Sequence, residues 1–255
     1  MLRVMMVYIL SLTTIGAIAA LWLLSYRLHC FSMIAPFIAI AFISFSFVEI
    51  KIVNKNCFNK CYLKKGTLLF RIFSSKILLT LLYTFLALIF TLSLFIEMIF
   101  YSTTLKIYLI VHIFLMLFIY LAIKHSIKNM VHIESILARE WSINIGILIL
   151  FAAFVYITFN SYVPDFVEAS LESTIINASS QVSSSCRVID RIVRLKAEFN
   201  GAFWWIIDNT AEHIEHKMTR LGVWLSFILM NAFALLGVNR LIVTIIDLLD
   251  RTIRS

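Results

Sequence analysis

Two ionisable residues stand out among those inside predicted apolar segments, where charge is costly and usually serves a function. Glu97 is near the end of one segment and His112 is inside the next, with the Tyr101–Leu105 turn between them. A helical hairpin would place both at a similar depth, so the carboxylate and the imidazole can touch. Such a pair would respond to protons, because a carboxylate favours the protonated imidazole. The structural alternative is that Glu97 reaches the interface or Lys106, and that His112 hydrogen-bonds a neighbouring helix.

Two other groups contain metal-ligating residue types. Cys57 and Cys61 share a predicted side of the membrane with His125 and His132, but this C-x3-C and H-x6-H arrangement is not an established zinc spacing. The E-H-x-E-H cluster at 212–216 matches neither order of the zinc-protease motifs. The four cysteines also lack the spacing of a disulfide scaffold. We therefore predict no metal, no cofactor and no catalytic residue.

A third group is a basic segment at 51–76, which contains no acidic residue. We interpret it as a determinant of membrane topology and as a contact for anionic lipid head groups. A binding site for an acidic cytoplasmic partner is the alternative. Its cations are Lys51, Lys55, Lys60, Lys64, Lys65, Arg71 and Lys76.

Six apolar segments of membrane-spanning length must position these residues. The chain has 255 residues, of which 62% are hydrophobic and 14% charged, whereas a soluble domain carries about 25% charged residues. This composition excludes a soluble globular protein and predicts an all-α integral membrane protein. The predicted spans are at about 4–25, 29–50, 76–100, 105–124, 142–160 and 222–246.

The positive charges predict that both termini are cytoplasmic, in a plasma membrane or a bacterial inner membrane. With alternating spans, 14 Lys and Arg residues lie on the cytoplasmic side and only Arg27 and Lys106 lie in short outer loops. The net charge of +8 is therefore mainly a topology signature, and it does not predict nucleic-acid binding. Whether residues 1–19 are a cleaved signal peptide stays open, because small residues follow the first apolar run.

The longest stretch outside the predicted spans is an extracytoplasmic segment at 161–220. Its apolar residues recur every three or four positions, which predicts an amphipathic helix, with a bend at the serines of 179–185. Phe203, Trp204 and Trp205 suit a membrane interface or a partner surface. The predicted apolar stripe consists of Leu171, Ile175, Ala178, Val182, Cys186, Ile189 and Val193.

The predicted organisation has three parts. Residues 1–160 form a five-helix transmembrane region, 161–220 the amphipathic segment, and 221–255 the sixth helix with a short cytoplasmic tail. In that tail, acids four residues before arginines predict a helical continuation. Gly16 and Ala20 in the first span have the small-xxx-small spacing of closely packed membrane helices.

Three functions remain open at this point. The first is a non-catalytic subunit of a larger membrane complex for secretion, transport or sensing, which contacts other membrane proteins, or a second copy of itself, through 161–220 and 51–76. The second is an oligomeric ion or small-solute channel, because such channels need no catalytic motif. The third is a membrane enzyme, which we rank last because neither Glu97/His112 nor the 212–216 cluster includes a clear nucleophile.

Overall fold

The computed structural model describes residues 2–62, 76–130, 134–160, 164–210 and 217–254. Its regular elements are all helices, and six of them are long and apolar enough to cross a membrane, as predicted. Continuous helices suit apolar surroundings because they satisfy their own backbone hydrogen bonds. The six are α1 (Leu2–Ser25), α2 (Ile34–Tyr62), α4 (Lys76–Phe100), α5 (Thr103–Ile127), α6 (Glu134–Phe159) and α9 (Lys217–Arg254).

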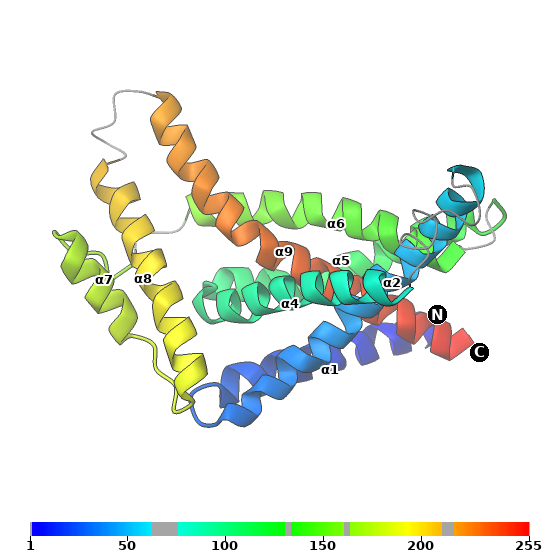
Figure 1. Cartoon of the computed structure of the whole chain (residues 1–255), viewed down its shortest axis with the longest axis horizontal. Coiled ribbons are helices and arrows are strands. Elements are labelled where there is room, and N and C mark those ends of the chain that lie inside the picture. The colour runs from blue at the N-terminus through cyan, green and yellow to red at the C-terminus, as the bar shows by residue number, and fades with distance from the viewer. Residues whose placement is uncertain (1, 63–75, 131–133, 161–163, 211–216, 255) are drawn as a thin grey trace.

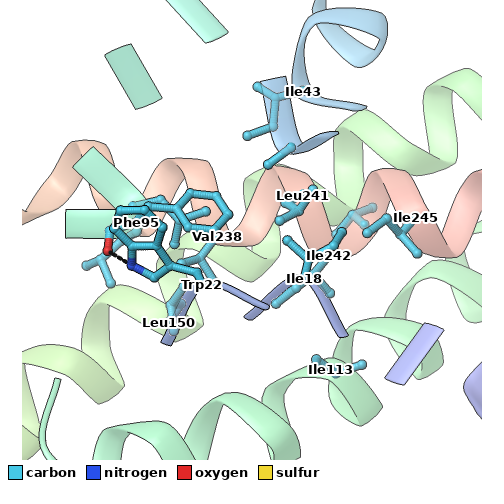
Figure 2. Close-up of a cluster of buried hydrophobic side chains, with 14 of the residues drawn as sticks. Ile18, Trp22, Ile43, Phe95, Ile113, Leu150, Val238, Leu241, Ile242 and Ile245 are labelled. Atoms are coloured by element: carbon cyan, nitrogen blue, oxygen red, sulfur yellow. Dashed lines mark hydrogen bonds between the residues drawn. The ribbon is translucent and has the colours of Figure 1, made fainter. Parts of the chain in front are cut away.

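Helix α9 is the central element of the bundle, since it packs against each of the other five membrane-length helices (Figure 1). Figure 2 shows its side chains Val238, Leu241, Ile242 and Ile245 within the buried apolar core. The helices around α9 also contact one another. The indole N–H of Trp22 in α1 donates a hydrogen bond to the carbonyl oxygen of Phe95 in α4, at 2.7 Å.

The last helix extends beyond the predicted span at both ends. Its 38 residues are about 57 Å long, whereas the hydrocarbon core of a bilayer is about 30 Å thick. Among the residues searched, the stretch of α9 that is apolar enough to span a membrane is Asn231–Ile253, and the first half of α9 projects from the bundle (Figure 1). Asp247 and Asp250, which the sequence placed beyond the span, are buried in the bundle.

Two shorter helices, α7 (Leu171–Ser180) and α8 (Arg187–Thr210), lie across one end of the bundle (Figure 1). We call this the α8 end, and we call the opposite end, where both chain termini lie, the terminal end. The segment is thus two helices, with a break at the predicted serine-rich bend. Most of the predicted stripe is buried within the chain itself, namely Ala178, Val182, Cys186, Ile189 and Val193.

The serine-rich connection attaches α8 to the end of α1. The backbone N–H of Ser185 donates to the carbonyl oxygen of Arg27 at 3.0 Å, and the hydroxyls of Ser184 and Ser185 donate to the carbonyls of Tyr26 and Leu28. Serine suits this role because its hydroxyl satisfies the carbonyl groups that a helix end leaves without partners.

Candidate functional site

The most heavily charged part of the core is centred on Asp247 of α9 and Arg139 of α6, whose side chains are both 0% exposed. They form an ion pair at 3.2 Å between Oδ2 and Nη1. The hydroxyl of Tyr120 donates to Oδ1 of Asp247 at 2.7 Å. Arg251, one helical turn further along α9, donates to both carboxylate oxygens at 3.0 and 2.6 Å. Both oxygens of Asp247 are therefore occupied.

Glu49 of α2 extends these contacts to another helix. Its carboxylate accepts from Arg139 and from Arg251, the latter at 2.7 Å. Next to it, Arg240 of α9 donates two hydrogen bonds to Glu140 of α6, at 3.0 and 3.3 Å. A bidentate arginine pair of this kind fixes the relative orientation of the two side chains as well as their distance.

Asp250 connects α9 to two more helices. Its Oδ2 accepts from Lys124 of α5 at 3.1 Å, and its Oδ1 accepts from Arg3 of α1 at 3.2 Å. Lys124 also donates to the hydroxyl of Tyr120 at 3.1 Å. We call the whole set the ionic cluster; its members are Arg3, Glu49, Tyr120, Lys124, Arg139, Glu140, Arg240, Asp247, Asp250 and Arg251.

The side chains of the ionic cluster neutralise one another's charges, and the cluster does not present a reactive group to a substrate. A lone charge near the bilayer centre costs at least about 2.5–3.5 kcal/mol, and pairing with good hydrogen bonds offsets such a cost. Because every carboxylate in the ionic cluster accepts from at least one cation, the ionic cluster fixes the rotation and the axial position of α9 relative to α1, α2, α5 and α6.

Sequence reasoning missed the ionic cluster because the most apolar stretch of the last helix was taken as its span. A signal was nevertheless present. Polar residues recur at spacings of four, three and four at Arg240, Thr244, Asp247 and Arg251, and the residues between them are apolar except for Asp250. A narrow polar stripe on an otherwise apolar helix is typical of a helix surrounded by other helices.

The predicted pair of Glu97 and His112 does not form, because each side chain has a different partner. Glu97 forms an ion pair with Lys196 of α8. His112 Nε2 lies 3.1 Å from Oδ1 of Asn239 on α9. The amide nitrogen of Asn239 donates to the carbonyl oxygen of Ile143 at 2.7 Å, so its Oδ1 is left to accept from the imidazole. The structural alternative describes His112 correctly, whereas Glu97 reaches α8 instead of Lys106.

At the α8 end, Cys30 of the short helix η1 (Cys30–Met33) and Cys186 form a disulfide. The prediction that the cysteines form no disulfide framework is thus corrected at one pair. The sequence did contain a signal, since both residues lie on the predicted outer side, whereas Cys57 and Cys61 lie on the other. The bond joins residues 156 positions apart and holds the start of α8 against the bundle.

A cavity of about 330 Å³ lies beneath α8, and Glu97, Tyr101, Asn200, Trp204 and Asn231 are among the residues that line it. Glu97 is almost completely buried and forms its ion pair with Lys196 of α8. Trp204, predicted as part of an interfacial anchor, thus faces the bundle. This places polar groups of α4, α8, α9 and the turn after α4 around one space.

The other two predicted anchors, Phe203 and Trp205, are partly buried on α8. Trp205 Nε1 donates to the carbonyl oxygen of Ala169 at 3.4 Å. Helix α8 also carries a row of exposed apolar side chains. Val188, Ile192, Leu195 and Phe199 recur at spacings of four, three and four, and each is 36–58% exposed. We call this row the α8 seam.

Several predicted residues lie partly or wholly outside the described part of the chain. Of the basic segment, Lys51, Lys55 and Lys76 are described, and the ammonium of Lys51 lies 5.5 Å from the ring centroid of Tyr83. The side chains of Lys60, Cys57 and Cys61 are outside it. So are Lys64, Lys65, Arg71, His132 and the 212–216 cluster. Among the described residues, no three His, Cys, Asp or Glu side chains gather as metal ligands would.

No family model, no curated protein and no solved structure matches this chain. The class of protein that the fold itself defines is a multi-pass helical membrane protein.

Proposed function

We propose that this protein is a non-catalytic subunit of a larger membrane complex and that it binds another membrane protein through the α8 seam. The observation that carries the proposal is the exposure of four large apolar side chains at the heptad-like spacing of four, three and four. That spacing aligns side chains along one helix face, as helix–helix contacts require. The neighbouring face of α8 is already buried against the bundle and α7, so the seam is a separate surface.

Two further features support a role in assembly. The projecting half of α9 also exposes apolar side chains, at Leu225, Leu229 and Phe233, and exposed apolar patches commonly mark interaction sites. The ionic cluster, in turn, uses its charged groups to bind helices to one another. A bundle whose helices are fixed in this way suits a scaffold that presents a docking helix. It suits a transporter or pump with large conformational changes less well.

We infer that the α8 end is extracytoplasmic and that the terminal end, with the basic segment 51–76, is cytoplasmic. The Cys30–Cys186 disulfide supports this orientation, because disulfides persist on the oxidising side of a membrane. In a variant that lacks Cys57 and Cys61, an impermeant maleimide is expected to label Ser173→Cys in intact cells. It is expected to label Lys128→Cys only after lysis, and the reverse pattern would refute the orientation.

The docking proposal is tested by placing a benzophenone amino acid at Leu195 and irradiating intact membranes. We expect a crosslinked adduct with a second membrane protein or with a second copy of this chain. The matched control is Ile176 of α7, which is also apolar and exposed but lies off the seam. Absence of an adduct at Leu195, or equal adducts at both positions, would contradict the proposal.

The effect on affinity is tested by the double substitution Leu195→Lys with Phe199→Lys. We expect recovery of the crosslinked partner, after mild-detergent extraction, to fall at least about tenfold, because two charges would be buried in an apolar contact. Ile176→Lys is expected to leave recovery unchanged. Equal recovery with all three chains would show that the seam is not the binding surface.

The second candidate is an oligomeric ion or small-solute channel with α9 along its path. The observation in its favour is a series of buried polar side chains on the central helix, at Asn231, Asn239 and Thr244. Ion flux from the purified protein in liposomes tests it. Flux abolished by Asn239→Leu would favour the channel, whereas an absence of flux over a range of voltage and pH would exclude it.

A further inference from the structure

A second cavity, of about 430 Å³, lies within the membrane-spanning part of the bundle and is formed by α1, α4, α5 and α9. Ile18, Ile113 and Leu241, which Figure 2 shows in the core, belong to its walls. Its lining residues are apolar with the exception of Lys106. We call this space the α1–α5 groove, and we propose that it holds an acyl chain of an anionic phospholipid whose phosphate pairs with Lys106.

The groove exists because α1 stands away from its neighbours at Gly16. A side-chain carbon added at Gly16 would meet no atom within 4 Å, although the sequence predicts close helix packing at this position. At Gly237 of α9, by contrast, the same atom would lie 2.7 Å from the carbonyl oxygen of Phe90. The space beside Gly16 is therefore a local feature of α1 and not a property of every glycine in the bundle.

The apolar walls select the chemical class of the occupant. A peptide segment in this groove would leave its own backbone N–H and C=O groups without partners, which is costly in apolar surroundings. An acyl chain has no such groups, and it is the apolar molecule that a bilayer supplies. The groove is also much too small for a further helix, since an α-helix with its side chains is about 10–12 Å across.

Lys106 determines the charge of the head group. It lies in the first turn of α5, at the end of the groove nearest α8, and its side chain is exposed. Among the described residues its ammonium has no ion pair or hydrogen bond, and Glu97, which the sequence offered as one possible partner, is paired with Lys196. A phosphate group at the membrane interface would supply the missing counter-charge.

The test uses full-length protein reconstituted in vesicles of equal phosphatidylglycerol and phosphatidylcholine, extracted in mild detergent and examined by native mass spectrometry. We expect about one retained phospholipid per chain, with phosphatidylglycerol preferred about fivefold, as one interfacial cation can supply. Gly16→Phe places a ring in the groove from a position where an added Cβ meets no atom within 4 Å, and it is expected to reduce retention at least about fivefold. Gly222→Phe is the matched control, because Gly222 also has no atom within 4 Å but lies outside the groove.

A second filling variant, Ala19→Phe, replaces Gly16→Phe if that chain does not fold. Lys106→Gln is expected to keep the retained lipid but to bring the ratio of the two phospholipids to about one. A wild-type chain without bound phospholipid, or equal retention by the groove-filling and Gly222→Phe chains, would overturn the proposal. An unchanged preference in Lys106→Gln would overturn the assignment of the head group.

Discussion

Asp247 and Arg139 show how a bundle of this composition can contain fully buried charges. Each would be costly alone, yet Asp247 accepts from Tyr120, Arg139 and Arg251, and Arg139 also donates to Glu49. The contribution of the ionic cluster to the free energy of folding therefore depends on all of its partners being present more than on any single pair. Removing one partner leaves another charge buried without compensation.

Asp247→Asn is expected to destabilise the folded protein by about 3–5 kcal/mol, because it leaves Arg139 and Arg251 short of negative charge at a buried position. The measurement is reversible unfolding in mixtures of a mild detergent and dodecyl sulfate. Glu172→Gln, at an exposed carboxylate of α7, is the control and is expected to change stability by less than about 0.5 kcal/mol.

The double variant Asp247→Asn with Arg139→Gln makes this prediction specific. Because both charges of the pair are then absent, we expect it to lose less stability than the sum of the two single variants, by at least about 1 kcal/mol. Strictly additive losses would show that the two side chains do not interact energetically.

Asp190 of α8 provides a pH-dependent contact outside the membrane-spanning segments. The backbone N–H of Ser184 and the guanidinium of Arg194 both donate to its carboxylate, and they hold the pKa of Asp190 below its ordinary value of 3.8. A lowered pKa stabilises the fold above the ordinary value, and this contribution is lost as the pH falls through the lowered one. We therefore expect the melting temperature of wild type to exceed that of Asp190→Asn at about pH 6 and to approach it near pH 3. A difference that grows as the pH falls would contradict this assignment.

At the scale of single residues, the sequence indicated polar residues that lie inside the bundle but not which residues they contact. It singled out Glu97 and His112 as polar groups inside predicted spans, and both are buried, but the candidate pair between them does not form. The partners Lys196 and Asn239 lie 99 and 127 positions further along the chain, and hydropathy patterns contain no information about contacts between distant segments. Charge sign and membrane side reduce the number of possible partners for a residue. Membrane side alone would have been sufficient to pair Cys30 with Cys186.

At the scale of elements, helix contacts are set by where glycine allows a close approach. Gly237→Ala would place a methyl group 2.7 Å from the carbonyl oxygen of Phe90, and this backbone atom cannot move aside easily. We expect a loss of about 1–3 kcal/mol of stability. Gly16→Ala meets no atom, so it is expected to be neutral or to stabilise α1 by up to about 1 kcal/mol. Thermal melting of the two purified variants distinguishes the positions, and equal losses would mean that α9 and α4 are not in close contact at Gly237.

The existence of the membrane helices was predictable because apolar runs of about 20 residues have few alternatives to a spanning helix. Their packing was not. The two halves of α9 are both apolar, and only the polar stripe from Arg240 to Arg251 distinguishes the half that lies in the bundle. For α8, the same periodic reasoning identified the buried stripe but overlooked the α8 seam, since one helix can carry two apolar faces.

At the scale of the whole molecule, the two ends of the bundle are held together in different ways. The terminal end is joined by ion pairs among five membrane-length helices, and the α8 end by the disulfide and the Glu97–Lys196 pair. The α1–α5 groove and the α8 seam lie apart from the ionic cluster. The terminal end thus maintains the packing of the bundle, while the groove and the seam are the surfaces that we propose for lipid and for a partner.

Truncation of the chain distinguishes a central last helix from a free tail. A chain that ends at residue 246 keeps the whole predicted span of 222–246 but lacks Asp247, Asp250 and Arg251 of the ionic cluster. If residues beyond 246 formed a free cytoplasmic tail, this chain would still fold. Because they form the centre of the terminal end instead, we expect it to lose its monodisperse peak in size-exclusion chromatography and its cooperative melting. A chain that ends at Thr252 retains every residue of the ionic cluster, so it is expected to melt within a few degrees of the full chain. A cooperative melt of the chain that ends at residue 246 would refute the central position of this part of α9.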